Sequence, residues 1–181
     1  MSPSSIAPLS MDLRPLLGKP WKIGIMPGVL DSTSAIDTLK KISTWTQTRP
    51  FSPCVVQVFP ASKIGGLAHV GFAGAGMALA LNANSMAFRR PELEWLGRVA
   101  GERHLEKAQS RVGWSSKEKE CVVGFLLPSS ARMNSILSSF SKDIHFTPGL
   151  VSFGAGLSLP SFPLSPEDYF IERAALSGLR E

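Results

Sequence analysis

The sequence has few of the residues that usually mark a catalytic, metal-binding or disulfide-stapled protein. Its 181 residues include two cysteines, Cys54 and Cys121, and no CxxC pair. Each cysteine lies in an apolar run typical of a strand, so we expect two buried free thiols in a reducing compartment. The three histidines lie far apart, and no HxxxH pair or cluster of Cys and His indicates a zinc site.

The glycine motifs of nucleotide-binding enzymes are incomplete. Residues 66–71 have the glycine spacing of a P-loop, but Phe72 and Ala73 stand where Lys and Ser or Thr must reach phosphate and magnesium. The later glycines of this segment form no GxGxxG fingerprint, and helix packing explains them better. There is no GxSxG elbow and no carboxylate pair in contrasting surroundings. We therefore expect no catalytic residue, cofactor or metal, and a small hydrolase or nucleotide-binding enzyme is the least favoured function.

No apolar run is long enough to span a membrane, because the run over 67–81 falls short of the ~20 residues that a bilayer requires. Residues 1–10 lack the basic and apolar regions of a secretory signal, so we expect an intracellular protein, cytoplasmic and also nuclear if its source is a eukaryote. Lys and Arg number 19 against 14 Asp and Glu, a net charge of +5. This balance favours an acidic partner, most commonly a nucleic acid.

Length and hydrophobic pattern predict one α/β domain. With 44% hydrophobic and 18% charged residues, the chain is large enough to bury a core by itself. Residues 1–20 are rich in Ser and Pro without periodicity, and we interpret them as an irregular tail. Residues 21–181 are expected to form a single domain with a mixed sheet of about four strands and a cluster of central helices.

Apolar periodicity places the individual elements. Strands are expected over 21–26, where Pro27 and Gly28 end the first, and over 54–59, 120–127 and 150–153. A helix capped by Ser32 or Ser34 should carry three apolar residues on one face, namely Ile36, Leu39 and Ile42. Further helices are expected over 67–81, 131–140 and 165–178, the last with Ser165 as its N-cap.

The stretch from Pro91 to Gly113 is a helical pattern with Gly101 in its middle. Apolar residues recur at helical spacing on both sides of Gly101, which costs roughly 1 kcal/mol against alanine in a helix interior and therefore indicates a break. Pro91 is typical of a first turn, and Gly113 of a left-handed C-terminal cap. Three basic residues follow the break at i, i+4 and i+8: Arg103, Lys107 and Arg111. They form either a binding surface or a solvated face.

Four segments follow one another between Val56 and Gly113. They are Val-Gln-Val-Phe59, Ala-Ser-Lys-Ile64, an alanine-rich helix that includes His69, and Arg98-Val-Ala-Gly-Glu-Arg-His-Leu105. In this order they resemble the small kinase-binding regulatory subunit of the KEOPS (EKC) complex, the TPRKB family. Ala100 and His104 stand where that family has a serine and a glutamine. Residues 171–176 resemble the family's last helix, whereas 1–20 and 147–163 fit it poorly.

The resemblance implies a non-catalytic subunit that binds the complex's small protein kinase and, through it, serves the threonylcarbamoyl transferase subunit, which modifies the adenosine beside the tRNA anticodon. It also implies contact with the single-stranded 3′ CCA end of tRNA. In such recognition, cations follow phosphates and planar groups stack on bases. The candidate RNA-binding residues are Lys63, His69, Arg89, Arg90, Arg98, Arg103, His104 and Lys107.

These candidates have structural alternatives. Arg98 and Arg103 serve equally well to hold the break at Gly101 together, by bonding helix carbonyls or a carboxylate such as Glu94. His69, at the start of a helix, favours a structural role. For the whole chain the alternative is a generic intracellular protein-interaction module without a nucleic-acid role, whose binding would change little with salt.

Overall fold

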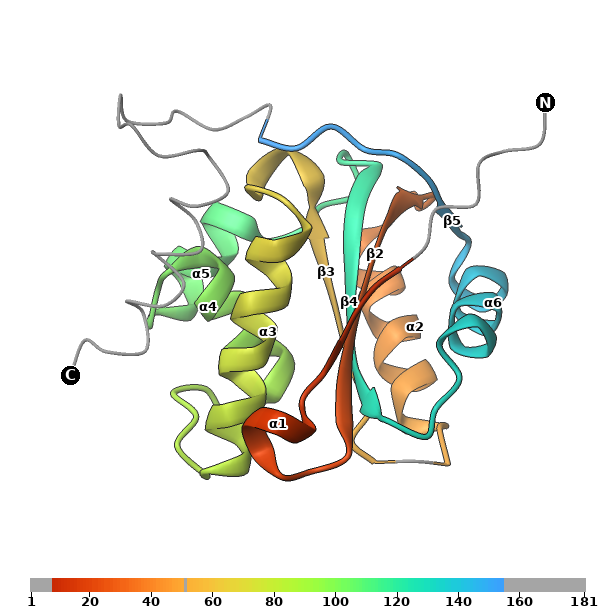
Figure 1. Cartoon of the computed structure of the whole chain (residues 1–181). Coiled ribbons are helices and arrows are strands. Elements are labelled where there is room, and N and C mark those ends of the chain that lie inside the picture. The colour runs from red at the N-terminus through yellow and green to blue at the C-terminus, as the bar shows by residue number, and fades with distance from the viewer. Residues whose placement is uncertain (1–7, 51, 155–181) are drawn as a thin grey trace.

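An antiparallel sheet of five strands lies between two groups of helices in the computed structural model, which describes residues 8–50 and 52–154. Helices α3, α4 and α5 cover one face of the sheet, and α2 and α6 cover the other (Figure 1). The elements are β1 (Leu9–Asp12), α1 (Arg14–Leu17), β2 (Trp21–Leu30), α2 (Ala35–Gln47), β3 (Val55–Pro60), the 3-10 turn η1 (Ala61–Lys63), α3 (Leu67–Asn82), α4 (Pro91–Ala100), α5 (Leu105–Val112), β4 (Glu120–Pro128), α6 (Met133–Ile144) and β5 (Phe146–Pro148).

The strand order is β1-β2-β4-β3, and β5 pairs with the far end of β2. The α/β class expected from the sequence is confirmed. The sheet is antiparallel throughout the described residues and has five strands, where the pattern predicts a mixed sheet of about four. Each face of the sheet buries its own apolar cluster, one beneath α3, α4 and α5 and the other beneath α2 and α6.

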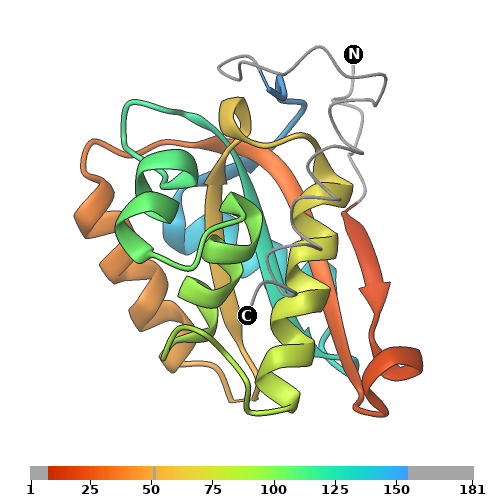
Figure 2. The ribbon, with the colours of Figure 1, turned by 90° about the vertical axis from the view of Figure 1, so that its left-hand side faces the viewer.

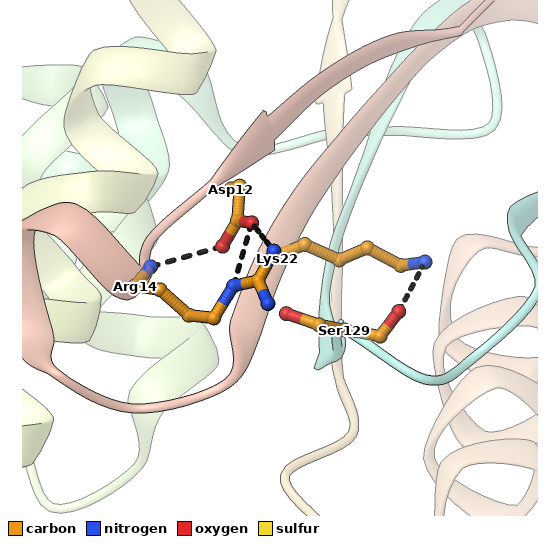
Figure 3. A network of polar contacts seen from close by, with 4 residues as sticks. All are labelled: Asp12, Arg14, Lys22 and Ser129. Atoms are coloured by element: carbon orange, nitrogen blue, oxygen red, sulfur yellow. Dashed lines mark hydrogen bonds and ion pairs between the residues drawn. The ribbon is translucent and has the colours of Figure 1, made fainter.

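Residues 9–12 form strand β1 and residues 14–17 form helix α1, so the expectation of an irregular tail over 1–20 is wrong for its described part. β1 pairs with β2 along its whole length. The Asp12 carboxylate accepts hydrogen bonds from the backbone and the Nε of Arg14 at 3.0 and 2.8 Å, and Lys22 donates to the Ser129 carbonyl at 3.1 Å (Figure 3). Three of the four β1 residues are exposed, so this edge strand lacks the alternation of buried and exposed side chains by which a strand is recognised in a sequence.

β2 continues through Pro27 and Gly28, where the pattern predicts that the first strand ends. β1 pairs with β2 only as far as Ile25, and β5 pairs with β2 only from Gly28 onward, so Pro27 falls between these two partners. The Pro27 carbonyl accepts a hydrogen bond from the Gly149 amide at 3.1 Å, and its backbone therefore faces this interval and not β4. Because no strand lies opposite, the missing proline N–H breaks no ladder hydrogen bond.

The strands at β3 and β4 and the helices at α3 and α6 are confirmed, and α6 continues to Ile144. The strand expected over 150–153 is wrong. β5 instead covers Phe146–Pro148, where it can pair with β2, while Leu150 is exposed. The helix expected over 165–178 lies outside the described residues.

α2 buries a different face from the expected one. Ile36 and Leu39 should be buried with Ile42, but their exposed fractions are 67% and 42%. The buried residues of α2 are Thr38, Ile42 and Trp45. Trp45 sets this orientation, because its ring packs edge-on against Phe140 of α6 with 5.3 Å between the ring centroids.

Trp95 of α4 fixes α3 and α4 against the sheet. Its Nε1 donates a hydrogen bond to the Val70 carbonyl of α3 at 3.0 Å. A Cβ atom added to Gly74 of α3 would lie 2.5 Å from the ring, and one added to Gly124 of β4 would lie 2.6 Å from it. Both glycines are therefore needed for the close approach of the indole. This packing confirms that at least Gly74, among the glycines of α3, serves the core.

Candidate functional site

The segment with the strongest resemblance forms the junction between α4 and α5 (Figure 1). α4 ends before Gly101, whose φ of 64° is left-handed, and the break predicted at this glycine is confirmed. Pro91 occupies the first turn of α4, as expected. The left-handed cap expected at Gly113 is wrong. Its φ is −66°, and its N–H closes the last turn of α5 on the Gln109 carbonyl.

Arg98 binds a buried carboxylate on its own helix. Glu94 is only 2% exposed and accepts hydrogen bonds from the Arg98 Nε at 2.9 Å and from the amides of Ala87 and Phe88 at 2.8 and 3.0 Å. The Arg98 side chain is 18% exposed. The structural alternative for Arg98 is therefore supported, because this pair holds the preceding loop and the end of α4 together.

Arg111, and not Arg103, holds the break at Gly101 together. Its guanidinium forms an ion pair with Glu102 at 2.6 Å and donates a hydrogen bond to the Ala100 carbonyl at 3.5 Å. The turn between α4 and α5 is thus fastened from the C-terminal half of α5. Arg103 is exposed, and Arg111 takes the structural role at this turn in its place.

His69 lies inside the protein, which supports the structural role that the sequence favours over contact with a base. The ring is 1% exposed. Its Nδ1 accepts a hydrogen bond from the Gly65 amide at 3.2 Å, and its Nε2 lies 3.1 Å from the Val99 carbonyl. Because a carbonyl only accepts, we assign the proton to Nε2. Burial lowers the pKa of His69 from 6.5 to about 4, against the opposing effect of the Val99 hydrogen bond. The neutral ring thus joins the start of α3 to the end of α4.

Lys63 and Arg90 line a groove with a volume of about 750 Å³. The Lys63 Nζ lies 3.3 Å from a carboxylate oxygen of Glu118, and Arg90 pairs with Glu92. Its lining residues come from α2 on one side and from α4 and α5 on the other, with β3 along it. Figure 2 shows α2 beside α4 and α5. The sequence analysis did not predict this groove. The signal for it in the sequence is the apolar pair Ile36 and Leu39 on α2, which the core does not bury.

The other four candidates are exposed: Arg89, Arg103, His104 and Lys107. No acidic side chain within the described residues forms an ion pair with any of them. Arg103, His104 and Lys107 lie together at the junction and in the first turn of α5. Arg89 lies at the opposite end of α4, about 15 Å away by the rise of a ten-residue helix. Three of the eight candidates are therefore exposed close together in the chain at the start of α5, and we call these three residues the junction surface.

Both cysteines are held as unreactive thiols by burial. Burial raises the pKa of Cys54 to about 11 and that of Cys121 to about 12, so both remain thiols near neutral pH. Cys54 is half-buried and Cys121 fully buried, and neither forms a disulfide, as the sequence predicts for free thiols. No group of three or more His, Cys, Asp or Glu in the described part of the chain is placed to hold a metal.

None of the described helices is both long and apolar enough to cross a membrane. Comparison of the chain with protein-family models and with curated proteins finds no match.

Proposed function

We propose that this chain is a non-catalytic subunit of a KEOPS-type (EKC) complex, similar to the TPRKB family. In this role it binds the complex's small protein kinase and the 3′ CCA end of tRNA, and so supports threonylcarbamoyladenosine formation by the transferase subunit. The complex would act in the cytoplasm, and also in the nucleus if the source is a eukaryote. The proposal rests on the motif order between Val56 and Gly113 and on one structural observation, the junction surface.

The junction surface has the chemistry that a single strand of RNA requires. Arg103 lies in the turn before α5 and Lys107 lies in the first turn of that helix, so both are at the N-terminal end of α5. Both are exposed without a carboxylate partner among the described residues, so neither must break an ion pair to bind a phosphate. His104, the N-cap residue of α5, lies between them in the chain and offers a planar ring for stacking on a base.

A tRNA gel shift with matched variants tests this surface. Arg103→Gln combined with Lys107→Gln should weaken tRNA binding and, by the loss of two phosphate contacts, lower the slope of log K against log salt by about 1.4. The control combines Lys117→Gln with Lys119→Gln, which removes the same charge from exposed positions before β4. Equal losses in the two double variants would show that only net charge matters and would remove the junction surface from the proposal.

The kinase half of the proposal needs its own test. A pull-down with the purified small kinase of the complex should retain the wild-type chain and the junction variant equally, because the RNA contacts are not needed for the protein contact. Failure of the wild-type chain to bind the kinase would contradict the assignment to the complex, whatever the tRNA result.

A generic protein-interaction module is the second candidate function, and the groove beside β3 favours it. Binding through this groove would depend on exposed aliphatic residues of α2 and change little with salt, whereas binding of tRNA would weaken steeply. Salt dependence therefore separates the two functions.

A further inference from the structure

α2 has apolar residues both in the core and along the groove. Ile42 and Trp45 pack in the core, while Ile36 and Leu39 are exposed and line the groove. A single exposed aliphatic residue needs no explanation, but two of them beside a hollow of about 750 Å³ are typical of an interaction site. The groove therefore has an apolar wall on the α2 side.

β3 lies along this groove with an unpaired edge. It is the last strand of the sheet and pairs with β4 on one side only. The Val58 amide donates no hydrogen bond to a strand; it donates to the side chain of its neighbour, the Oε1 of Gln57, at 3.2 Å. Because backbone groups alternate along a strand, the amide and carbonyl of Val56 face the same way as those of Val58. No backbone group of another described segment pairs with this outer edge.

Gln57 covers the edge in the present structure. Val56 and Val58 are buried, and the side-chain amide oxygen of Gln57 occupies the hydrogen-bonding position that a neighbouring strand would take. A side chain is moved more easily than a helix, so an entering strand has to displace only this amide to reach the Val58 N–H.

Cations outnumber acidic residues among the described residues that line the groove. Lys63 and Arg90 line it, each paired with a carboxylate, and Lys40 lines it from α2, whereas Glu92 is the one acidic side chain among these described lining residues. The Arg90 side chain of the pair with Glu92 is 61% exposed, and exposed ion pairs contribute only about 0–1 kcal/mol, so an incoming carboxylate can compete for the guanidinium. Charge complementarity therefore favours an acidic occupant.

We propose that the groove binds an extended, acidic segment of a partner protein by strand addition to β3. Main-chain hydrogen bonds to Val56 and Val58 replace the Gln57 contact. Alternate side chains of an added strand point to opposite faces, so one set lies against Ile36 and Leu39 and the other faces the cations. The partner segment thus alternates aliphatic and acidic residues over about five to seven positions, the usual length of a strand.

Two other occupants fit the groove less well. An RNA strand needs exposed rings for stacking, and the aromatic lining residue Trp114 is buried with its Nε1 bonded to the Glu118 carbonyl. The outward carbonyls of β3 would also repel phosphates. A second copy of this chain would bring two positively charged grooves together, which costs free energy through like-charge repulsion.

Selection from a phage-displayed library of random heptapeptides on the full chain tests the proposal. Selected peptides should alternate aliphatic residues with Asp or Glu. A synthetic selected peptide should bind at least tenfold more weakly to Leu39→Asp, and Ile36→Asp should repeat the loss. Thr44→Asp is the control, since Thr44 is exposed on the same helix and does not line the groove. Failure to enrich any alternating acidic peptide would overturn the proposal.

Backbone methylation of the peptide tests strand addition itself. N-methylation of every second amide should abolish binding in one register and be tolerated in the other, because only one set of amides faces β3. Equal binding of the two methylated series would refute strand addition. Loss of tRNA binding in Leu39→Asp would assign the groove to RNA, and loss of a concentration-dependent dimer would assign it to a second copy; both results contradict the proposal. These variants leave the junction surface intact, so failure here is distinct from failure of the proposed function.

Discussion

The Glu94→Gln variant should destabilise the protein strongly although it changes only one atom. One oxygen of Glu94 accepts from Arg98, and the other accepts from the amides of Ala87 and Phe88. Glutamine supplies one oxygen and one NH₂ group. In either orientation, the NH₂ therefore faces a buried donor that no longer has an acceptor.

The size of the loss follows from these contacts. A hydrogen bond to a charged group contributes about 1.5–3 kcal/mol, and removing one partner of a buried ion pair costs about 3–5 kcal/mol. Because the Arg98 side chain is 18% exposed, water relieves part of that cost. We expect the free energy of unfolding to fall by about 2–4 kcal/mol, which lowers Tm by about 5–15 °C for a domain of this size.

Urea unfolding followed by tryptophan fluorescence measures this loss, and Glu92→Gln is the matched control. Glu92 pairs with Arg90, whose side chain is 61% exposed, so its change should cost less than about 1 kcal/mol. Equal losses for Glu94→Gln and Glu92→Gln would refute the view that Glu94 holds the loop and α4 together.

Three further predictions concern the core and the junction. Lowering the pH from about 6.5 to 4 should reduce the free energy of unfolding by about 3 kcal/mol through His69, because the unfolded chain then binds the proton that the buried ring rejects. Urea titrations should lose this slope in His69→Gln and keep it in His104→Gln. Gly74→Ala should cost about 1–3 kcal/mol by collision with Trp95, and an unchanged Tm would contradict that packing. Gly101→Ala should cost about 1–2 kcal/mol, measured by urea unfolding, and no loss would contradict the left-handed junction.

The sequence predicted those elements whose signals are local. The break at Gly101 is an example, because a glycine between two apolar patterns needs no tertiary context. The face of α2 was not predictable in this way. Two pairs of residues on α2 fit a buried helical face equally well, Ile36 with Leu39 and Thr38 with Trp45. Which face is buried depends on Phe140, about 100 residues away in the chain, against which Trp45 packs.

The candidate site divides in the same manner. The exposed charge of Arg103 and Lys107 could be predicted, since surface cations rarely need partners. The burial of His69 could not be predicted, because its hydrogen bonds to Gly65 and Val99 join it to a loop and to the end of another helix. Glu94 was expected only as a partner of Arg98. Its hydrogen bonds from the amides of Ala87 and Phe88 depend on the path of the loop, which no sequence pattern indicates.

The affinity of the chain for intact tRNA, compared with the same tRNA lacking its 3′ CCA, tests the proposed function most directly. Measured with the kinase present and over a range of salt concentrations, intact tRNA should bind more tightly at every salt concentration, and the Arg103→Gln and Lys107→Gln double variant should lose that difference. Equal affinity of the wild-type chain for the two tRNAs would contradict recognition of the 3′ end.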